Sequence, residues 1–187
     1  MKKCLGRIFL VFKWCKLLFL MVMCTFLCGC SFLDSSAILD HGQELANQKF
    51  DQVLTSVQSK DADKLKRLFS DACKKDVDNL DASITELFSY FIGNVEAVDD
   101  WGACYAETSK EDNQVFQAIE ATYDVKTDAG TYRFAIRIIS EDTKNSDNIG
   151  VQSLYIVKAD DTSLEYAYWG DGRFTPGIHI GVENSDV

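Results

Sequence analysis

Histidine is nearly absent from this chain, and so are the motifs with which most enzymes hold a nucleophile, a phosphate or a metal. Only His41 and His179 occur among 187 residues. The sequence has no Gly-x-Ser-x-Gly turn, Walker loop, His-Glu-x-x-His helix or dinucleotide fingerprint. Motifs therefore predict no catalytic residue, no metal and no cofactor. Each histidine is interpreted as a surface or core-edge side chain.

Basic residues are scarce after position 29. Residues 1–29 carry five lysines and arginines and no acid, so the remaining 158 residues hold 14 basic residues against 29 acidic ones, a net charge of −15. Nucleic-acid binding needs clustered Lys and Arg, so this balance excludes nucleic acid as a partner. The acidity serves either solubility and repulsion from anionic lipid, or a face that attracts cations or a basic partner.

The first 29 residues have the order of a secretion signal. Five basic residues precede an apolar run of eleven, Leu17 to Leu27, which is signal-peptide size. The stretch Leu27-Cys28-Gly29-Cys30 that follows resembles the lipobox of bacterial lipoproteins. In such proteins a diacylglycerol is attached to the cysteine and the signal is cut just before it. By that resemblance the cut falls between Gly29 and Cys30, and Cys30 carries the lipid.

An uncleaved transmembrane helix over residues 8–32 is the alternative. It would hold Lys13 and Lys16 inside the bilayer, at about 2.5–3.5 kcal/mol each near the membrane centre. The acyl chains on Cys30 would instead contribute about 0.8 kcal/mol per buried methylene, which is enough for stable anchoring. Lipidation is therefore favoured, and either arrangement leaves the rest of the chain outside the cytoplasm.

The length beyond the signal predicts one domain. We expect a signal peptide at 1–29, a lipidated tether at 30–37 and a single domain at 38–187. This is too short for the two-lobed solute-binding lipoproteins. Of seven cysteines, Cys73 and Cys104 are the one pair left to form an internal disulfide, which is permitted outside the cytoplasm. The alternative is two separately packed small residues, and two thiols with two histidines argue against a zinc site.

Helical spacing dominates up to residue 93. A first amphipathic helix is expected from an apolar stripe, a second short helix from a cap at Asp61, and a third helix from a capping box formed by Ser83 and Glu86. The third helix should end at Gly93. The stripe of the first helix comprises Ala46, Phe50, Val53 and Val57.

The period changes to two at Val95, which predicts strands. Turn-like stretches at 128–130 and 160–162 make neighbouring strands antiparallel. Helices followed by strands indicate an α+β class, with three N-terminal helices on a curved antiparallel sheet of four to six strands. The expected inward sets are Trp101, Ala103 and Tyr105; Ile119, Ala121, Tyr123 and Val125; Tyr132, Phe134, Ile136 and Ile138; and Val151, Ser153, Tyr155 and Val157.

This element order resembles the nuclear-transport-factor-two-like (NTF2-like) cone fold over roughly residues 38–170. In that fold three helices cover a bent sheet and leave a pocket at its wide end. The segments 88–93, 147–150, 168–172 and 175–178 are similar to those of an uncharacterised lipoprotein family of clostridial-type Gram-positive bacteria, a domain of unknown function. The likeness implies host and fold and supplies no catalytic residues.

Enzymes of the cone fold place an acid or histidine in the pocket beside a tyrosine, which suggests acid-base candidates here. The alternative for the tyrosines is plain core packing. These candidates are Asp99, Asp100, Tyr105, Tyr123 and Tyr155. A second cluster, Asn145, Asp147 and Asn148, offers oxygens to calcium, but its spacing fails for a calcium loop and favours a polar hairpin loop.

The segment 168–177 combines aromatics, three glycines and the sole proline. It forms either an ordered loop that exposes a binding surface, with Tyr168, Trp169, Asp171 and Phe174, or a cover for one end of the core.

We therefore expect an extracytoplasmic lipoprotein, held at the cell membrane by diacylglycerol on Cys30, whose domain binds a small ligand or an envelope protein. The alternatives are a pocket enzyme doing acid-base chemistry on a small molecule and a purely structural or immunity-type partner.

Overall fold

The computed structural model describes residues 32–111, 114–160 and 175–181, and for residues 32–40, 104–106 and 111 it describes the backbone alone. The chain divides into two units, residues 1–40 and 41–187. Helix α2 (Phe32–Gln58) runs through the division. All packing between helices and sheet described below belongs to the second unit.

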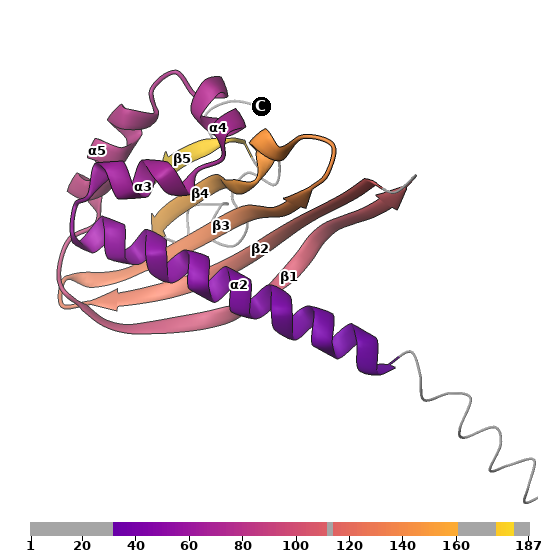
Figure 1. Ribbon diagram of the computed structural model, residues 1–187. Coiled ribbons are helices and arrows are strands. Elements are labelled where there is room, and N and C mark those ends of the chain that lie inside the picture. The colour runs from indigo at the N-terminus through magenta and orange to yellow at the C-terminus, as the bar shows by residue number, and fades with distance from the viewer. Residues whose placement is uncertain (1–31, 112–113, 161–174, 182–187) are drawn as a thin grey trace, which may run out of the picture. The chain divides into compact units, whose positions relative to one another are not determined.

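The second unit is an α+β structure, as the sequence predicts (Figure 1). After α2 come the helices α3 (Ala62–Leu68), α4 (Asp71–Asp76) and α5 (Leu80–Tyr90). The described sheet has the order β1-β2-β3-β4-β5. Its strands are β1 (Val95–Glu111), β2 (Gln114–Thr127), β3 (Gly130–Asp142), β4 (Gly150–Lys158) and β5 (Gly177–Ile180), with a 3-10 turn η1 (Ser146–Asn148) before β4.

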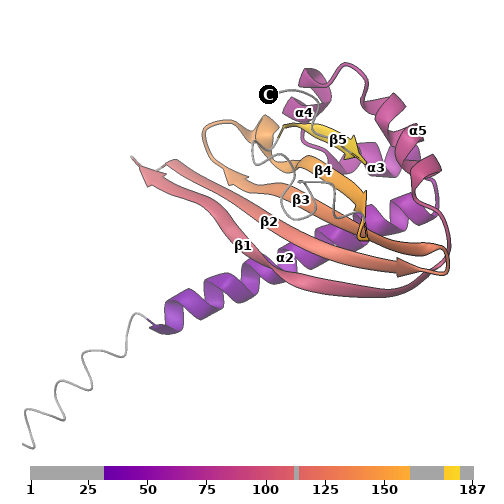
Figure 2. The same ribbon diagram turned by 180° about the vertical axis from the view of Figure 1, so that it is seen from behind.

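The sheet is mixed, which corrects the expectation of a fully antiparallel one. Strands β1 to β4 pair antiparallel, and the predicted turn at 128–130 closes the β2–β3 hairpin, where Thr127 pairs with Gly130. Strand β5, however, pairs parallel to β4. The second predicted turn, 160–162, falls largely outside the described residues. Figures 1 and 2 show α2 on one face of the sheet, with α3, α4 and α5 towards the β4 and β5 edge.

Helix α4 lies between the second and third predicted helices, where the sequence pattern predicts no helix. Its cap is Ser70, whose Oγ accepts a hydrogen bond from the Cys73 amide at 3.1 Å. The amide of Ser70 donates to the carbonyl of Val151 at 2.9 Å, which ties the α3–α4 linker to β4. The helix has one buried side chain, Cys73. With a single buried position, it leaves no apolar period in the sequence to detect.

The start of α5 also differs from the prediction. The helix begins at Leu80 with Asn79 as its cap, one turn before Ser83. The Ser83 amide donates to the Asn79 carbonyl at 3.0 Å, so Ser83 lies inside the helix and the predicted capping box was wrong. Leu80 is buried, and its burial favours the extra turn over a start at Ser83. At the other end, the helix stops at Tyr90, shortly before the predicted Gly93.

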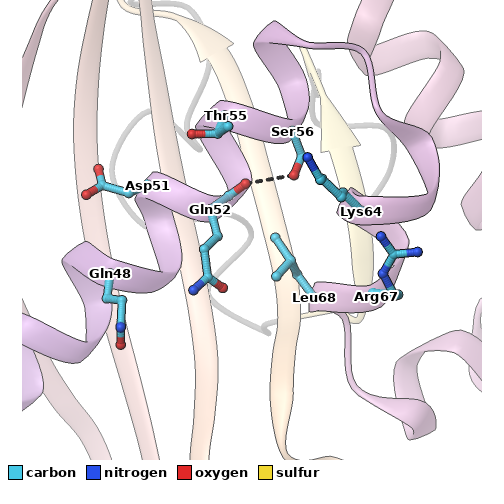
Figure 3. A pocket seen from close by; sticks show the side chains of 8 residues that line it. All are labelled: Gln48, Asp51, Gln52, Thr55, Ser56, Lys64, Arg67 and Leu68. Carbon is cyan, nitrogen blue, oxygen red and sulfur yellow. Dashed lines mark hydrogen bonds between the residues drawn. The ribbon is translucent and has the colours of Figure 1, made fainter.

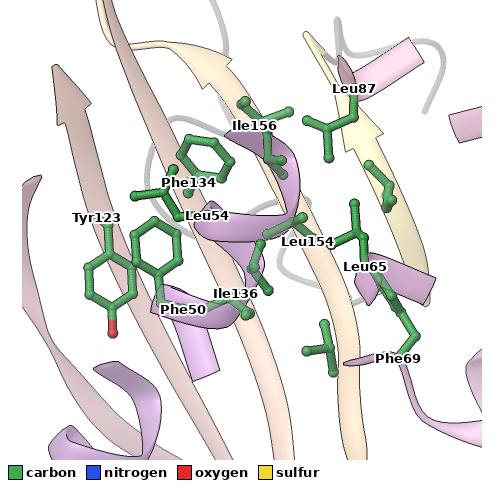
Figure 4. Packing of buried hydrophobic residues seen from close by; sticks show 14 of the residues in the cluster. Phe50, Leu54, Leu65, Phe69, Leu87, Tyr123, Phe134, Ile136, Leu154 and Ile156 are labelled. Carbon is green, nitrogen blue, oxygen red and sulfur yellow. The ribbon is translucent and has the colours of Figure 1, made fainter. Parts of the chain in front are cut away.

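The core lies between the helices and one face of the sheet (Figure 4). The ring of Phe50 stacks on Tyr123 with centroids 3.8 Å apart and meets Phe134 edge-on at 5.5 Å. The predicted inward sets of β2 and β3 are confirmed, since all eight residues belong to the buried cluster.

Two register shifts overturn the predicted faces of β1 and β4. In β4, Arg137 pairs with Ser153 whereas Ile138 pairs with Val151, so Gln152 is an extra residue. Val151 therefore faces the core, while Ser153 lies on the opposite face. In β1 a similar register shift falls between Asp100 and Ala103. As a result, Ala103 packs against the core whereas Trp101 is exposed. A strand period detects such bulges poorly because one extra residue inverts every later position.

Gly150 gives a test of the linker contact. Its φ is +134°, and a Cβ there would lie 2.9 Å from the Ser70 amide nitrogen and 3.1 Å from the Leu68 carbonyl oxygen. Gly130 has a comparable φ of +146° with open space around it. Backbone strain at such φ costs about 1–3 kcal/mol. Gly150→Ala should therefore lower the free energy of unfolding by that amount plus about 1–3 kcal/mol for the clash.

Urea unfolding of Gly150→Ala beside Gly130→Ala measures this difference, because Gly130→Ala carries the backbone term alone. Equal losses in the two variants would show that the crossing of the linker over β4 is looser than the structure has it.

Candidate functional site

The space between α5 and the sheet, where the resemblance to the cone fold implies a ligand pocket, holds core side chains instead. Leu80, Ile84 and Leu87 of α5 are buried there and belong to the same cluster as Leu154 and Ile156 of β4. These described side chains are apolar, and they fill the place where the pocket was expected.

The acid-base candidates do not converge on one site. Asp100 and Tyr123 are register partners of β1 and β2, and helix α2 holds both. Gln43 Nε2 donates to Asp100 Oδ2 at 2.6 Å, and the Tyr123 hydroxyl donates to Asn47 Oδ1 at 2.7 Å. Burial, together with the charges of Asp100 and Asp51, raises the pKa of Tyr123 and keeps its proton on. These contacts fasten α2 to the sheet.

The other candidates lie apart from that pair. Asp99 pairs in register with Asp124, and Tyr155 is buried on the sheet face opposite the helices. The ring of Tyr155 stacks on His179 with centroids 4.4 Å apart, and His179 Nε2 lies 2.9 Å from the Thr175 carbonyl oxygen. The side chain of Tyr105 falls outside the described residues. His41 is exposed.

Two arginines on that opposite face form ion pairs that join three strands. Arg137 donates to Glu120 at 2.6 Å and to Glu107 at 3.2 Å, and Glu120 and Arg137 are 7% and 9% exposed. Burial raises the pKa of Glu120, while Arg137 acts to lower it. Arg133 binds Asp124 through two hydrogen bonds of 2.7 and 2.8 Å. We call these five residues the ion-pair ladder.

The ion-pair ladder could have been predicted from the spacing of the charged residues in the strands, which is separate from the spacing of the apolar ones. Glu120, Asp124, Arg133 and Arg137 stand at alternate positions of β2 and β3, between the apolar residues that face the core. Because partners in adjacent antiparallel strands share a face, opposite charges at paired positions predict cross-strand ion pairs. Each guanidinium is matched by a carboxylate, so removing one partner would leave an unpaired charge on this face.

Helices α2 and α3 enclose a surface groove with a volume of about 470 Å³ (Figure 3). A tight turn brings the helices together, because the Asp61 amide donates to the Ser56 carbonyl at 2.9 Å and Lys60 adopts a φ of +51°. Asp61 also caps α3 through the Lys64 amide at 2.9 Å, as predicted. We call this recess the α2–α3 groove. Its lining residues are Gln48, Asp51, Gln52, Thr55, Ser56, Lys64, Arg67 and Leu68.

The α2–α3 groove has a fixed floor and a polar rim. Ser56 is buried and donates its hydroxyl to the Gln52 carbonyl at 2.8 Å, drawn as the dashed line in Figure 3. Leu68 is half-buried beside it. Amides, a carboxylate and two cations surround this floor, and a recess of this volume matches a small ligand. The sequence pattern did not predict the groove because Asp51 and Gln52 there belong to the solvent side of a single helix.

In the loop before β4, the side-chain oxygens form hydrogen bonds and an ion pair with other residues of the protein. Asp142 accepts hydrogen bonds from the amides of Lys144 and Asn145 and from Asn148 Nδ2, at 2.7 to 3.0 Å, and these bonds lower its pKa. Asp147 forms an ion pair with Lys75 at 2.7 Å. Within the described ranges no three His, Cys, Asp or Glu side chains gather as a metal site would require. The polar contacts agree with the hairpin-loop interpretation.

Cys73 is 2% exposed, and burial raises the pKa of its thiol to about 11. Its backbone belongs to α4, which contacts β4, whereas Cys104 lies on β1 at the far edge of the sheet. A disulfide needs Cα atoms within about 7 Å, and neighbouring strands alone are about 4.8 Å apart. This geometry disfavours the bond. The Cys104 side chain is not described, so the pairing stays a prediction.

Several predicted site residues lie outside the described residues: Gly29, Cys30, Tyr168, Trp169, Asp171 and Phe174. Of the helices that are described, none combines the length and hydropathy needed to cross a bilayer.

Fold and groove together define an α+β domain with a surface recess that polar side chains surround. Residues 52–159 match the family described as Domain of unknown function (DUF5104), and the chain belongs to that family. The matched span begins in α2 and ends just after β4, so it includes most of the α2–α3 groove and the strands of the ion-pair ladder. No curated protein matches the chain.

Proposed function

We propose that this chain is a bacterial lipoprotein, anchored by diacylglycerol on Cys30 at the outer face of the cell membrane, whose domain binds a small ligand in the α2–α3 groove. The observation that carries the binding part is the groove itself. It is a recess of small-ligand volume, with a mainly apolar wall and polar side chains around it, on a domain whose space beneath α5 is filled by core side chains. An envelope protein at the same surface is the second candidate.

The order of basic residues, apolar run and lipobox cysteine supports the anchor. The charge of −15 beyond residue 29 supports a domain that is repelled by anionic lipid and stays in solution at the end of its tether. The order of helices and strands supports a relation to the NTF2-like cone fold. The extra helix α4 and the parallel strand β5 are additions to that expected plan.

Protease treatment of intact cells tests the proposed location. A protease added to intact cells should degrade the domain, because no membrane lies between the protease and a chain on the outer face. A cytoplasmic protein probed in the same samples controls for leakage. Survival of the domain until the cells are lysed would contradict the proposal. In a host with an outer membrane, that membrane is first made permeable.

A further inference from the structure

The cations of the α2–α3 groove come from one face of α3. Lys64 and Arg67 are three residues apart, which places both on the same side of the helix, and Figure 3 shows them on the α3 side of the recess. Lys64 is already partly neutralised, since its Nζ lies 3.6 Å from Asp61. Asp61 also attracts Arg67, but more weakly, so Arg67 carries most of the positive charge that a ligand would meet.

Arg67 differs from the two other arginines in the described part of the chain. Arg133 and Arg137 each bind carboxylates at 2.6 to 3.2 Å, whereas Arg67 forms no ion pair with another described residue. It is exposed at the rim of the groove in a chain rich in acids. A guanidinium offers a planar pair of donors that matches a carboxylate. This makes Arg67 the receptor for an acidic group brought by a ligand.

The α2 side of the groove supplies two amides and the carboxylate of Asp51, which points away from the amides in Figure 3. Gln48 and Gln52 are one helical turn apart, and both side chains point to the same side of α2 in Figure 3. Neither side-chain amide forms a hydrogen bond with another described residue. Each amide offers donors and an acceptor, which is the pattern that peptide groups require.

From this arrangement we infer that the α2–α3 groove binds the C-terminal end of a short peptide. The terminal carboxylate lies on Arg67 with Lys64 beside it, and the peptide groups exchange hydrogen bonds with Gln48 and Gln52. The inference rests on the proposed function and names the ligand class for the same groove.

Calorimetric titration of the full-length protein in detergent tests the inference with two probes, tri-alanine and tri-alanine amide. Tri-alanine should bind, and its C-terminal amide should bind at least tenfold more weakly because the carboxylate is gone. Arg67→Gln should weaken tri-alanine at least tenfold, and Arg67→Lys should weaken it less because the charge remains. Lys158→Gln is the matched control: it removes one exposed positive charge from β4, away from the groove, and should leave binding unchanged.

Equal affinity for the acid and the amide would overturn the carboxylate assignment, and so would no binding of tri-alanine. Displacement of tri-alanine by inorganic phosphate at similar concentration would identify a general anion site and overturn the peptide assignment. The proposed function fails separately. It survives if tri-alanine amide binds and Gln52→Ala abolishes that binding. It falls if neither Gln52→Ala nor Arg67→Gln changes the binding of tri-alanine or of its amide.

Discussion

Replacing Cys30 with serine is expected to abolish lipid labelling completely and to leave a precursor longer by the 29 residues of the signal. In the proposed anchor, the Cys30 thiol is the nucleophile to which the diacylglycerol is attached, and a serine hydroxyl does not replace it. The lipidated chain is the form that the lipoprotein signal peptidase cuts, so processing should stop as well. Labelling of cells with radioactive palmitate, followed by gel electrophoresis, measures both effects.

Cys28 provides the matched control for that experiment. It lies two residues before Cys30 in the same stretch and would be removed with the signal. Cys28→Ser should therefore give a labelled, cut protein of normal size. Lipid labelling that survives Cys30→Ser, or that is lost with Cys28→Ser alone, would show that Cys30 is the wrong cysteine.

Replacing Arg137 with methionine is expected to lower the free energy of unfolding by about 3–5 kcal/mol. The substitution keeps a long side chain but leaves Glu120, which is 7% exposed, without its partner at 2.6 Å. An unpaired buried carboxylate lowers the free energy of unfolding far more than the loss of a surface ion pair does. Lys126→Met is the control because it breaks the exposed pair with Glu96, and it should cost about 1 kcal/mol or less.

The pH dependence separates this effect from a loss of packing. Burial already raises the pKa of Glu120, and removal of Arg137 should raise it further. A carboxyl whose pKa is higher in the folded than in the unfolded state binds a proton on folding. The destabilisation of Arg137→Met should therefore be fully present above the folded pKa and shrink as the pH falls towards the unfolded pKa.

The double variant Glu120→Gln with Arg137→Met should recover part of the loss at neutral pH, since no buried charge remains. Urea unfolding at several pH values measures all of these variants. A loss for Arg137→Met that is independent of pH and unrelieved by Glu120→Gln would show that Glu120 is solvated in the folded protein.

Elements with many buried positions were the predictable part of the fold. Tyr123 and Phe134 lie on strands whose inward residues alternate without interruption, and Phe50 belongs to a helical stripe that packs against them. Several buried residues in each element share the same spacing, so the element can be predicted even if one position departs from it. Helix α4 has one buried position, Cys73, and no such redundancy. The bulge at Gln152 shifted the faces of β4 by one residue, which a period of two does not reveal.

The candidate site was harder to predict because it depends on how two helices lie side by side. Gln52 and Arg67 belong to the polar faces of separate helices, where side chains of this kind are ordinary. Only the tight turn at Lys60 brings those faces together into a recess. By contrast, the pairing of Glu120 with Arg137 could have been predicted from the sequence. Both charged residues stand between core residues of adjacent strands, and opposite charges at paired positions form cross-strand ion pairs.

The lipid on Cys30 is the claim on which the proposed location depends, and the mass of the intact protein extracted from membranes tests it most directly. We expect a chain that begins at Cys30 and is heavier than residues 30–187 by a diacylglycerol group, with or without a further acyl chain on the amine. A mass equal to the unmodified chain, or to one that still contains residues 1–29, would contradict the claim.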